Sequence, residues 1–339
     1  MSMEVRLDEW REHALRFEAE VGRAVIGQAS VIRKITLALF ARGHVLLEGD
    51  VGVGKTTLLR AVARALGGAY GRVTGTVDLM PGDLVYYTYL DAEGRPRVDP
   101  GPVLQHGEAL SVFFFNEINR ARPQVHSVLL SLMAERSINA FNREYHLPHL
   151  LVFADRNQVE REETFELPAA ARDRFFMEIS MHAPGDQATQ RALIFDPRFY
   201  DSDALVAQVQ ENVLDHQALD QVARAIQASI HASDALQSYV VELWRATRHP
   251  ERAGLEIEGV DMGRLVAGGA SPRGAGALVR AARVHAWLNA RAMIVPEDIR
   301  AVFYEVMAHR IFLEPVYESR RDTIIASLCS QLFERVAVP

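Results

Sequence analysis

Continuous apolar runs alternate with amphipathic stretches through the first half of the chain. Each run stops at polar residues, a pattern typical of strands buried on both faces of a sheet. The predicted strands are 44–48, 111–115, 150–154 and 176–180. Apolar residues at helical spacing predict helices over 5–21, 31–40 (capped by Ser30) and 55–66. Strands alternating with helices indicate an α/β fold, with a parallel sheet flanked by helices.

Two hairpins are predicted between these buried strands. Asp91-Ala92-Glu93-Gly94 is a turn signal between extended segments at 84–90 and 95–98. Phe141-Asn142-Arg143 marks a second turn ahead of the strand at 150–154.

The second half of the chain changes to helical patterns with no convincing strand. Predicted helices cover 187–195, 219–230, 233–247, 272–291 and 296–311. Ser271-Pro272 supplies a capping hydroxyl followed by proline at the first helical position, and Val295-Pro296-Glu297-Asp298 is a similar start. We therefore predict two domains: an α/β nucleotide-binding core over residues 1–186 and an all-helical lid domain over residues 187–339.

Composition narrows the function classes. The 339 residues carry a formal net charge of -7, so no basic surplus indicates nucleic acid or an anionic membrane. Cys329 is the only cysteine, which excludes an intramolecular disulfide and a cysteine-based zinc site and fits a reducing cytoplasm. The sequence has no signal-peptide pattern and no apolar run long enough to span a bilayer. We expect a cytoplasmic protein without membrane insertion.

A phosphate-binding motif follows the first predicted strand. Residues 49–56 read Gly-Asp-Val-Gly-Val-Gly-Lys-Thr, which matches the P-loop pattern GxxxxGK[ST] between a strand and a helix. Backbone N–H groups of such a loop wrap a phosphate chain at a helix N-terminus. Lys55 would reach the β- and γ-phosphates of ATP, and Thr56 would ligate Mg²⁺. The expected nucleotide-binding residues here are Gly49, Val51, Gly52, Val53, Gly54, Lys55, Thr56 and Thr57.

A second motif ends the strand predicted at 111–115. Asn116 and Glu117 stand at the polar tip of this strand, in the place of the two acids of a Walker B motif. Glu117 would orient and polarise a water for attack on the γ-phosphate. Asn116 offers its amide oxygen to the metal shell without a negative charge.

The segment Asn116-Glu117-Ile118-Asn119-Arg120-Ala121, followed by Pro123, resembles the DEINRA segment of the MoxR family of AAA+ ATPases. The likeness covers most of the chain. It extends in order through Val25-Ile26-Gly27-Gln28, the P-loop, 100–103, 167–168, 173–175, 269–273 and 295–298. The P-loop alone is generic, whereas this ordered set is specific.

The resemblance implies further site residues. Asn157 corresponds to the sensor-1 Asn, which would help to hold the attacking water. Arg174 corresponds to the arginine finger that reaches the γ-phosphate of the neighbouring subunit, with Arg172 close by as an alternative. Arg273 corresponds to the sensor-2 Arg of the helical lid. The segment that packs against adenine would include Val25 and Ile26.

The chain departs from the family pattern near the metal. Asn116 replaces the Walker B Asp, and Asp155-Arg156 and Gln158 flank Asn157 where the family usually has Thr-Gln and Pro. Loss of a carboxylate close to the metal predicts slow turnover, and Asn116→Asp is expected to raise the rate.

The resemblance implies an ATP-driven, chaperone-like motor with ATP and Mg²⁺ as cofactors. Such proteins form rings, usually hexamers, and act on client proteins during assembly or cofactor insertion, often with a von Willebrand factor A-domain partner. A nucleotide-binding scaffold with weak hydrolysis is an alternative because of Asn116. A nucleic-acid motor is disfavoured, because residues 82–102 carry four acidic and only two basic residues.

Overall fold

The computed structural model describes residues 5–156 and 165–339 of the chain. They form two compact units. The sheet unit comprises the described residues of 12–174 and 179–220, and the helical unit comprises 175–178, 221–339 and the described residues up to 11. None of the helices in these described ranges is long and apolar enough to cross a membrane.

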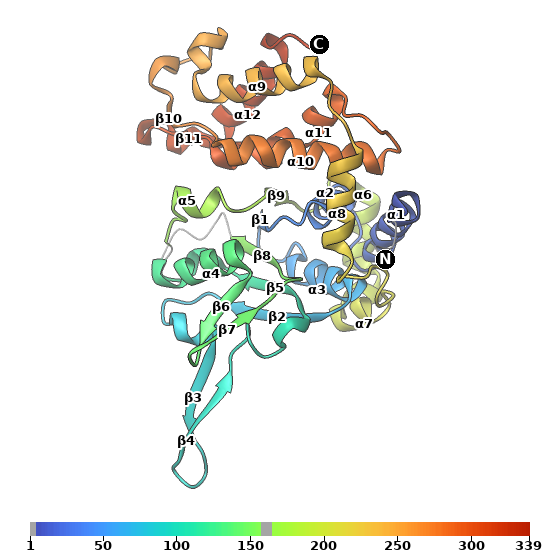
Figure 1. The fold of residues 1–339 in the computed structure, drawn as a ribbon, viewed down its shortest axis with the longest axis vertical. Coiled ribbons are helices and arrows are strands. Elements are labelled where there is room, and N and C mark those ends of the chain that lie inside the picture. The colour runs from blue at the N-terminus through green and yellow to red at the C-terminus, as the bar shows by residue number, and fades with distance from the viewer. Residues whose placement is uncertain (1–4, 157–164) are drawn as a thin grey trace. The chain divides into compact units, whose positions relative to one another are not determined.

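A five-stranded sheet in the order β2-β5-β8-β1-β9 organises the sheet unit (Figure 1). Parallel pairings join β2 to β5, β5 to β8 and β8 to β1. The strands are β1 (Val45–Gly49), β2 (Ala69–Thr74), β5 (Leu110–Asn116), β8 (Leu151–Arg156) and β9 (Met177–Met181). The α/β prediction and its four strands are confirmed.

Strand β2 was not predicted, and its position explains the omission. It stands at an edge of the sheet and reads Ala-Tyr-Gly-Arg-Val-Thr. Gly71 alone is fully buried along it, so the strand lacks the apolar run that marks a strand covered on both faces. By contrast, Phe113, Phe114 and Phe115 of β5 are all inaccessible to solvent.

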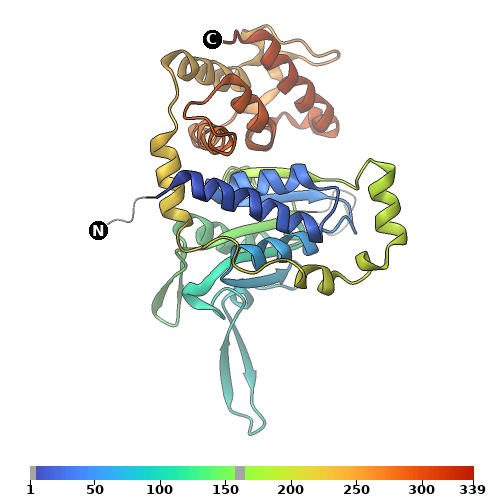
Figure 2. The ribbon, with the colours of Figure 1, turned by 90° about the vertical axis from the view of Figure 1, so that its right-hand side faces the viewer.

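Helices flank the sheet, and Figure 2 shows α1 lying over one side of it. These helices are α1 (Leu7–Ala24), α2 (Ala29–Phe40), α3 (Lys55–Leu66), α4 (Pro123–Glu135), α5 (Ala169–Arg172), α6 (Gln187–Phe195) and α7 (Ser202–Ala207). Helix α3 has the predicted bounds. The predicted Ser30 cap of α2 is wrong, because the helix begins at Ala29 with Gln28 at its N-cap.

Both predicted hairpins are present. Strands β3 (Tyr86–Leu90) and β4 (Pro96–Pro100) pair antiparallel, and every residue of the two strands is exposed. The turn is fixed by Asp91, whose Oδ1 accepts hydrogen bonds from the N–H groups of Glu93 and Arg95. This hairpin projects from the sheet unit (Figure 1), and the second consists of β6 (Ser137–Ala140) and β7 (Arg143–His146).

The helical unit is built from α8 (Leu219–Ser229), α9 (Asp234–Arg248), α10 (Pro272–Leu288), α11 (Pro296–Met307) and α12 (Arg321–Arg335). Strands β10 (Val266–Gly268) and β11 (Phe312–Leu313) also pair here, so the expectation of a strand-free second half is wrong. Helix α12 was not among the predicted helices. Ser271 caps α10 as expected, its Oγ accepting a hydrogen bond from the Gly274 N–H at 3.2 Å.

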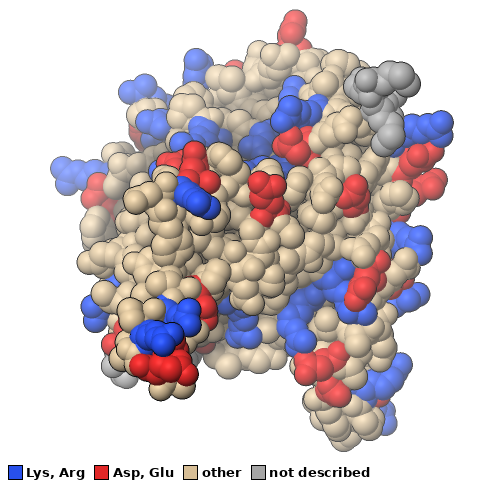
Figure 3. Space-filling model, turned by 60° about the horizontal axis from the view of Figure 1, so that its bottom comes forward, with Lys and Arg blue, Asp and Glu red and all other residues tan. Residues whose placement is uncertain are grey.

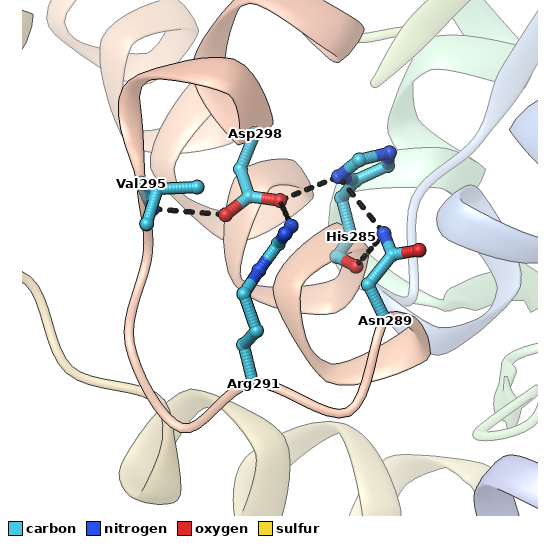
Figure 4. A network of polar contacts seen from close by, with 5 residues as sticks. All are labelled: His285, Asn289, Arg291, Val295 and Asp298. Atoms are coloured by element: carbon cyan, nitrogen blue, oxygen red, sulfur yellow. Dashed lines mark hydrogen bonds and ion pairs between the residues drawn. The ribbon is translucent and has the colours of Figure 1, made fainter.

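The carboxylate of Asp298 stabilises the N-terminus of α11 (Figure 4). Asp298 is fully buried, and its Oδ2 accepts the Val295 N–H at 2.9 Å. Its Oδ1 lies 2.6 Å from His285 Nδ1 on α10 and also contacts the Arg291 guanidinium. One side chain therefore caps α11 and connects it to the C-terminal end of α10.

The sheet unit extends beyond residue 186, where the boundary between the two domains was predicted. Helices α6 and α7 lie in the sheet unit, whose last residue is Asp220. Arg60 of α3 pairs with Asp203 of α7 at 2.5 Å, and Arg64 pairs with Glu211 at 2.6 Å. These contacts tie the segment after residue 186 to the helix that follows the P-loop.

Candidate nucleotide-binding site

The P-loop leaves the end of β1 and enters α3. Gly52 and Gly54 have φ values of 81° and 92°, left-handed conformations in which a side chain would be strained. A Cβ on Gly49 would collide with the Met181 carbonyl oxygen of β9. The glycines of the motif thus have distinct physical reasons to be there. Of the other predicted loop residues, Val51 is exposed, whereas Val53, Thr56 and Thr57 are half-buried.

Lys55 is buried at the start of α3 with its ammonium group held by two acceptors. Its Nζ donates a hydrogen bond to the Gly49 carbonyl oxygen at 2.7 Å and lies 3.2 Å from Oδ2 of Asp155. A buried ammonium is costly without such partners. The side chain is therefore folded back onto the first residue of its own loop.

Asp155 connects the P-loop to the end of β5. It lies in β8, 1% exposed, and its Oδ1 accepts a hydrogen bond from the Glu117 N–H at 2.5 Å. Burial raises the pKa of this carboxyl, while the Glu117 N–H and the Lys55 ammonium act in the opposite direction. Sequence reasoning noted Asp155 only as a departure from the family pattern, although a charged residue at the end of a buried strand was a usable signal.

Asn116 and Glu117 occupy the predicted tip of β5. Glu117 has a φ of 56°, unusual for a residue other than glycine, and its Oε2 pairs with Arg120 Nη1 at 3.0 Å. The Asn116 carbonyl accepts the Gly75 N–H at 2.7 Å, while a Cβ on Gly75 would collide with the Glu117 carbonyl. The backbone around the two residues is thus held by Gly75, just after β2, on one side and by Asp155 of β8 on the other.

The Val25-Ile26 segment lies in the turn between α1 and α2, close to the strand that borders the P-loop. Gln28 Nε2 donates a hydrogen bond to the His182 carbonyl oxygen at 2.7 Å, one residue beyond Met181. Val25 is buried and Ile26 is half-buried. The predicted adenine-side segment is therefore held, through Gln28, beside the end of β9, the strand that Gly49 closely approaches.

The three residues predicted from the resemblance to assist catalysis are spread along the chain. Arg174 follows α5 and its Nη1 donates a hydrogen bond to the Leu130 carbonyl oxygen of α4 at 2.6 Å. Arg273 is exposed in the first turn of α10, in the helical unit. Asn157 lies outside the described residues. The structure thus gathers Lys55 and Glu117 through Asp155, and it places Arg174 and Arg273 on other elements.

The side chains near the P-loop fit Mg²⁺ in their chemistry. Thr56, Asn116, Glu117 and Asp155 offer hydroxyl, amide and carboxylate oxygens, the donors that this ion prefers, and it commonly keeps water and phosphate among its ligands. Among the described residues there is no cluster of three or more His, Cys, Asp or Glu side chains arranged for a metal.

A P-loop on a five-stranded parallel sheet, followed by a helical unit, defines an ATPase of the AAA+ class. A sequence model described as "ATPase family associated with various cellular activities (AAA)" matches residues 44–177, and an AAA lid domain model matches residues 263–328. A crystal structure of a Cytophaga hutchinsonii protein superposes with a TM-score of 0.80 at 29% identity, covering 98% of this chain and 99% of that one.

Relatives specify the family. Protein MoxR of Methylorubrum extorquens is 65% identical over 333 residues, covering 98% of this chain and 97% of the relative. Protein MoxR of Paracoccus denitrificans is 56% identical over 337 residues, covering 99% of both. Chaperone MoxR1 of Mycobacterium tuberculosis is 33% identical, covering 94% of this chain and 81% of the relative. The chain belongs to the MoxR family of AAA+ ATPases.

Proposed function

We propose that this chain is an ATP-driven, chaperone-like motor that remodels or activates a client protein or complex, during assembly or during insertion of a cofactor or metal ion. The observation that carries the proposal is the contact chain from Lys55 through Asp155 to Glu117. It joins the phosphate-binding lysine to the residue suited to activate water. The name of the mycobacterial relative, a chaperone, supports the remodelling role.

The chemistry follows from the chain's own groups. N–H groups at the start of α3 and the Lys55 ammonium attract the phosphates of ATP, and Thr56 offers its hydroxyl to the metal. Glu117 orients and polarises the attacking water once its carboxylate is turned from Arg120 toward the nucleotide. Mg²⁺, when bound, neutralises charge on the phosphates. Asn157, Arg174 and Arg273 would complete the site as sensor 1, arginine finger and sensor 2.

We further propose a cytoplasmic ring of identical subunits, taken as a hexamer, with ATP between neighbours. The single cysteine, Cys329, fits a reducing compartment. A von Willebrand factor A-domain protein and a client enzyme are the proposed partners, and the exposed β3–β4 hairpin is a surface suited to contact them.

Hydrolysis assays on the purified chain test the proposal. We expect binding of ATP by calorimetry, Mg²⁺-dependent release of phosphate, and a nucleotide-dependent increase in mass by light scattering. Glu117→Gln should keep ATP bound and abolish turnover, and pull-down with this variant in ATP should retain the client. Absence of ATP binding by the wild-type chain would overturn the proposal.

Asn116 favours a second candidate function, a nucleotide-binding ring scaffold with weak hydrolysis. The amide brings no negative charge to the metal, and loss of such a group commonly weakens activity by roughly 10–100-fold. A ring that assembles with ATP and releases phosphate too slowly to support remodelling would select this function.

The surface offers less support for a nucleic-acid motor. Figure 3 shows Lys and Arg interspersed with Asp and Glu on the face from which the hairpin projects. At the hairpin, Arg97 pairs with Asp91 at 2.9 Å, so one of its two arginines is already neutralised. Salt-dependent binding of single-stranded DNA would support a nucleic-acid motor.

A further inference from the structure

The carboxyl ends of β5 and β8 carry different charges. Asn116 ends β5 without a charge, whereas Asp155 brings a carboxylate to the neighbouring strand β8. The two strands pair in parallel with Phe115 opposite Ala154, so Asn116 and Asp155 are the next residues along adjacent strands. Adjacent strands lie about 5 Å apart. A negative charge missing at position 116 is therefore present one strand away.

Strand β8 is the better placed of the two for contact with the P-loop. It stands between β5 and β1 in the sheet, and Asp155 is opposite Leu47, two residues before Gly49. From there one carboxylate reaches the Lys55 ammonium at 3.2 Å with one oxygen and the Glu117 N–H at 2.5 Å with the other. The same side chain thus contacts both motifs.

Burial of a charge at position 155 costs free energy, and the contacts with Lys55 and the Glu117 N–H offset it. A carboxylate that is 1% exposed must be paired or hydrogen-bonded to remain ionised. The hydrogen bond from Glu117 also holds a residue whose φ of 56° is strained. Next to it, Arg156 pairs with Glu48 of β1 at 2.9 Å, which fastens the two strands at the same level.

We propose that Asp155 supplies the carboxylate that this nucleotide site lacks at position 116. It is a positioning residue, holding Lys55 and the Glu117 backbone in place in the free protein, and its negative charge favours a divalent cation that arrives with ATP. The inference rests on the proposed nucleotide site. Binding of phosphate by Lys55 releases one oxygen of Asp155 from the ammonium, and the hydrogen bond to Glu117 remains.

This assignment reverses the expectation for Asn116→Asp. With Asp155 in place, a second carboxylate on the adjacent strand adds like-charge repulsion in a buried site. The substitution is then expected to bring no gain by itself. It should help only when position 155 has been neutralised.

The test is a charge swap, measured at equilibrium. Binding of a nonhydrolysable ATP analogue is followed by calorimetry at increasing Mg²⁺ in the wild-type chain, Asp155→Asn, Asn116→Asp and the double variant. Asp155→Asn should raise the Mg²⁺ concentration for half-maximal binding at least tenfold, and the double variant should recover most of that loss. Glu334→Gln, at an exposed acid on α12, is the matched control and should behave as the wild type.

Two results would overturn the proposal: unchanged Mg²⁺ dependence in Asp155→Asn, or a double variant no better than Asp155→Asn. A purely structural role for Asp155 would not be rescued by an acid at position 116. Should Asp155→Asn not fold, Asp155→Thr, which keeps an acceptor for the Glu117 N–H, takes its place in the same comparison. Failure of the wild-type chain to bind the analogue would instead refute the proposed function.

Discussion

Lys55 is a single residue at which we expect stability and ligand binding to be linked. Its side chain is 8% exposed and its ammonium pairs with the buried Asp155, so removal of one partner leaves an uncompensated charge. We expect Lys55→Met to abolish measurable ATP binding and to lower the stability of the free protein by about 3 kcal/mol. Calorimetry with ATP and thermal unfolding check the two effects separately.

The second half of this prediction has its own control. Adding Asp155→Asn to Lys55→Met removes the orphaned charge, so the double variant should regain stability and still fail to bind ATP. Wild-type ATP affinity in Lys55→Met would contradict the assignment of the P-loop. Equal stability of the single and double variants would show that Lys55 and Asp155 do not interact.

Cys329 illustrates a residue whose environment controls its reactivity. It is 5% exposed in α12, and burial, assisted by the charge of Glu305, raises the pKa of its thiol to about 12. The thiolate is the nucleophile, so native protein at pH 8 should resist alkylation by iodoacetamide, whereas denatured protein should react. Mass spectrometry of the alkylated product distinguishes the two states.

The same shift in the pKa of Cys329 predicts a pH dependence. Above the ordinary thiol pKa of 9.0, the unfolded chain loses this proton while the folded chain keeps it until about pH 12. Stability is thus fully present below pH 9 and falls as pH rises, by up to about 1.4 kcal/mol per pH unit from this group. Denaturant unfolding of Cys329→Ala should show a shallower decline between pH 9 and 11.

At the scale of elements, the sequence predicted what depends on local pattern. Apolar runs located strands β1, β5, β8 and β9, and the P-loop motif located the loop between β1 and α3. Strand β2 was missed because it lies at an edge of the sheet and has one buried residue, whereas the other edge strand, β9, has three. The contact between Lys55 and Asp155 was not predicted because 100 residues separate them in the sequence, and only the pairing of β1 with β8 brings them together.

Helix α11 depends on one side chain for its start. Asp298 accepts the Val295 N–H and contacts His285 and Arg291 while fully buried. Asp298→Asn keeps the shape of the side chain but removes the negative charge that contacts His285 and Arg291. We expect a loss of about 2 kcal/mol in stability. Glu297→Gln, at the exposed neighbour, is the matched control and should cost under about 0.5 kcal/mol. Similar losses of stability in both variants would show that the buried charge of Asp298 does not stabilise α11 more than an exposed acid does.

At the scale of the whole molecule, Arg174 tests the proposal that one subunit completes the nucleotide site of the next. Arg174 donates a hydrogen bond to the Leu130 carbonyl oxygen of its own α4, yet it is the residue proposed as the arginine finger that acts on a neighbour. We expect Arg174→Ala to keep ATP affinity within about twofold and to lower kcat by at least roughly 10³-fold, because such arginines stabilise charge only in the transition state.

Mixing two inactive variants decides between an action in trans and a structural role. In rings containing both Arg174→Ala and Lys55→Met subunits, some interfaces pair an intact P-loop with an intact finger, and those should recover ATPase activity. Recovery should rise and fall with the mixing ratio, since it needs one subunit of each kind at an interface. Thermal unfolding of Arg174→Ala reports the lost bond to Leu130 independently. Rings proven to be mixed that remain inactive, together with a large loss of stability, would assign Arg174 to the packing of α4.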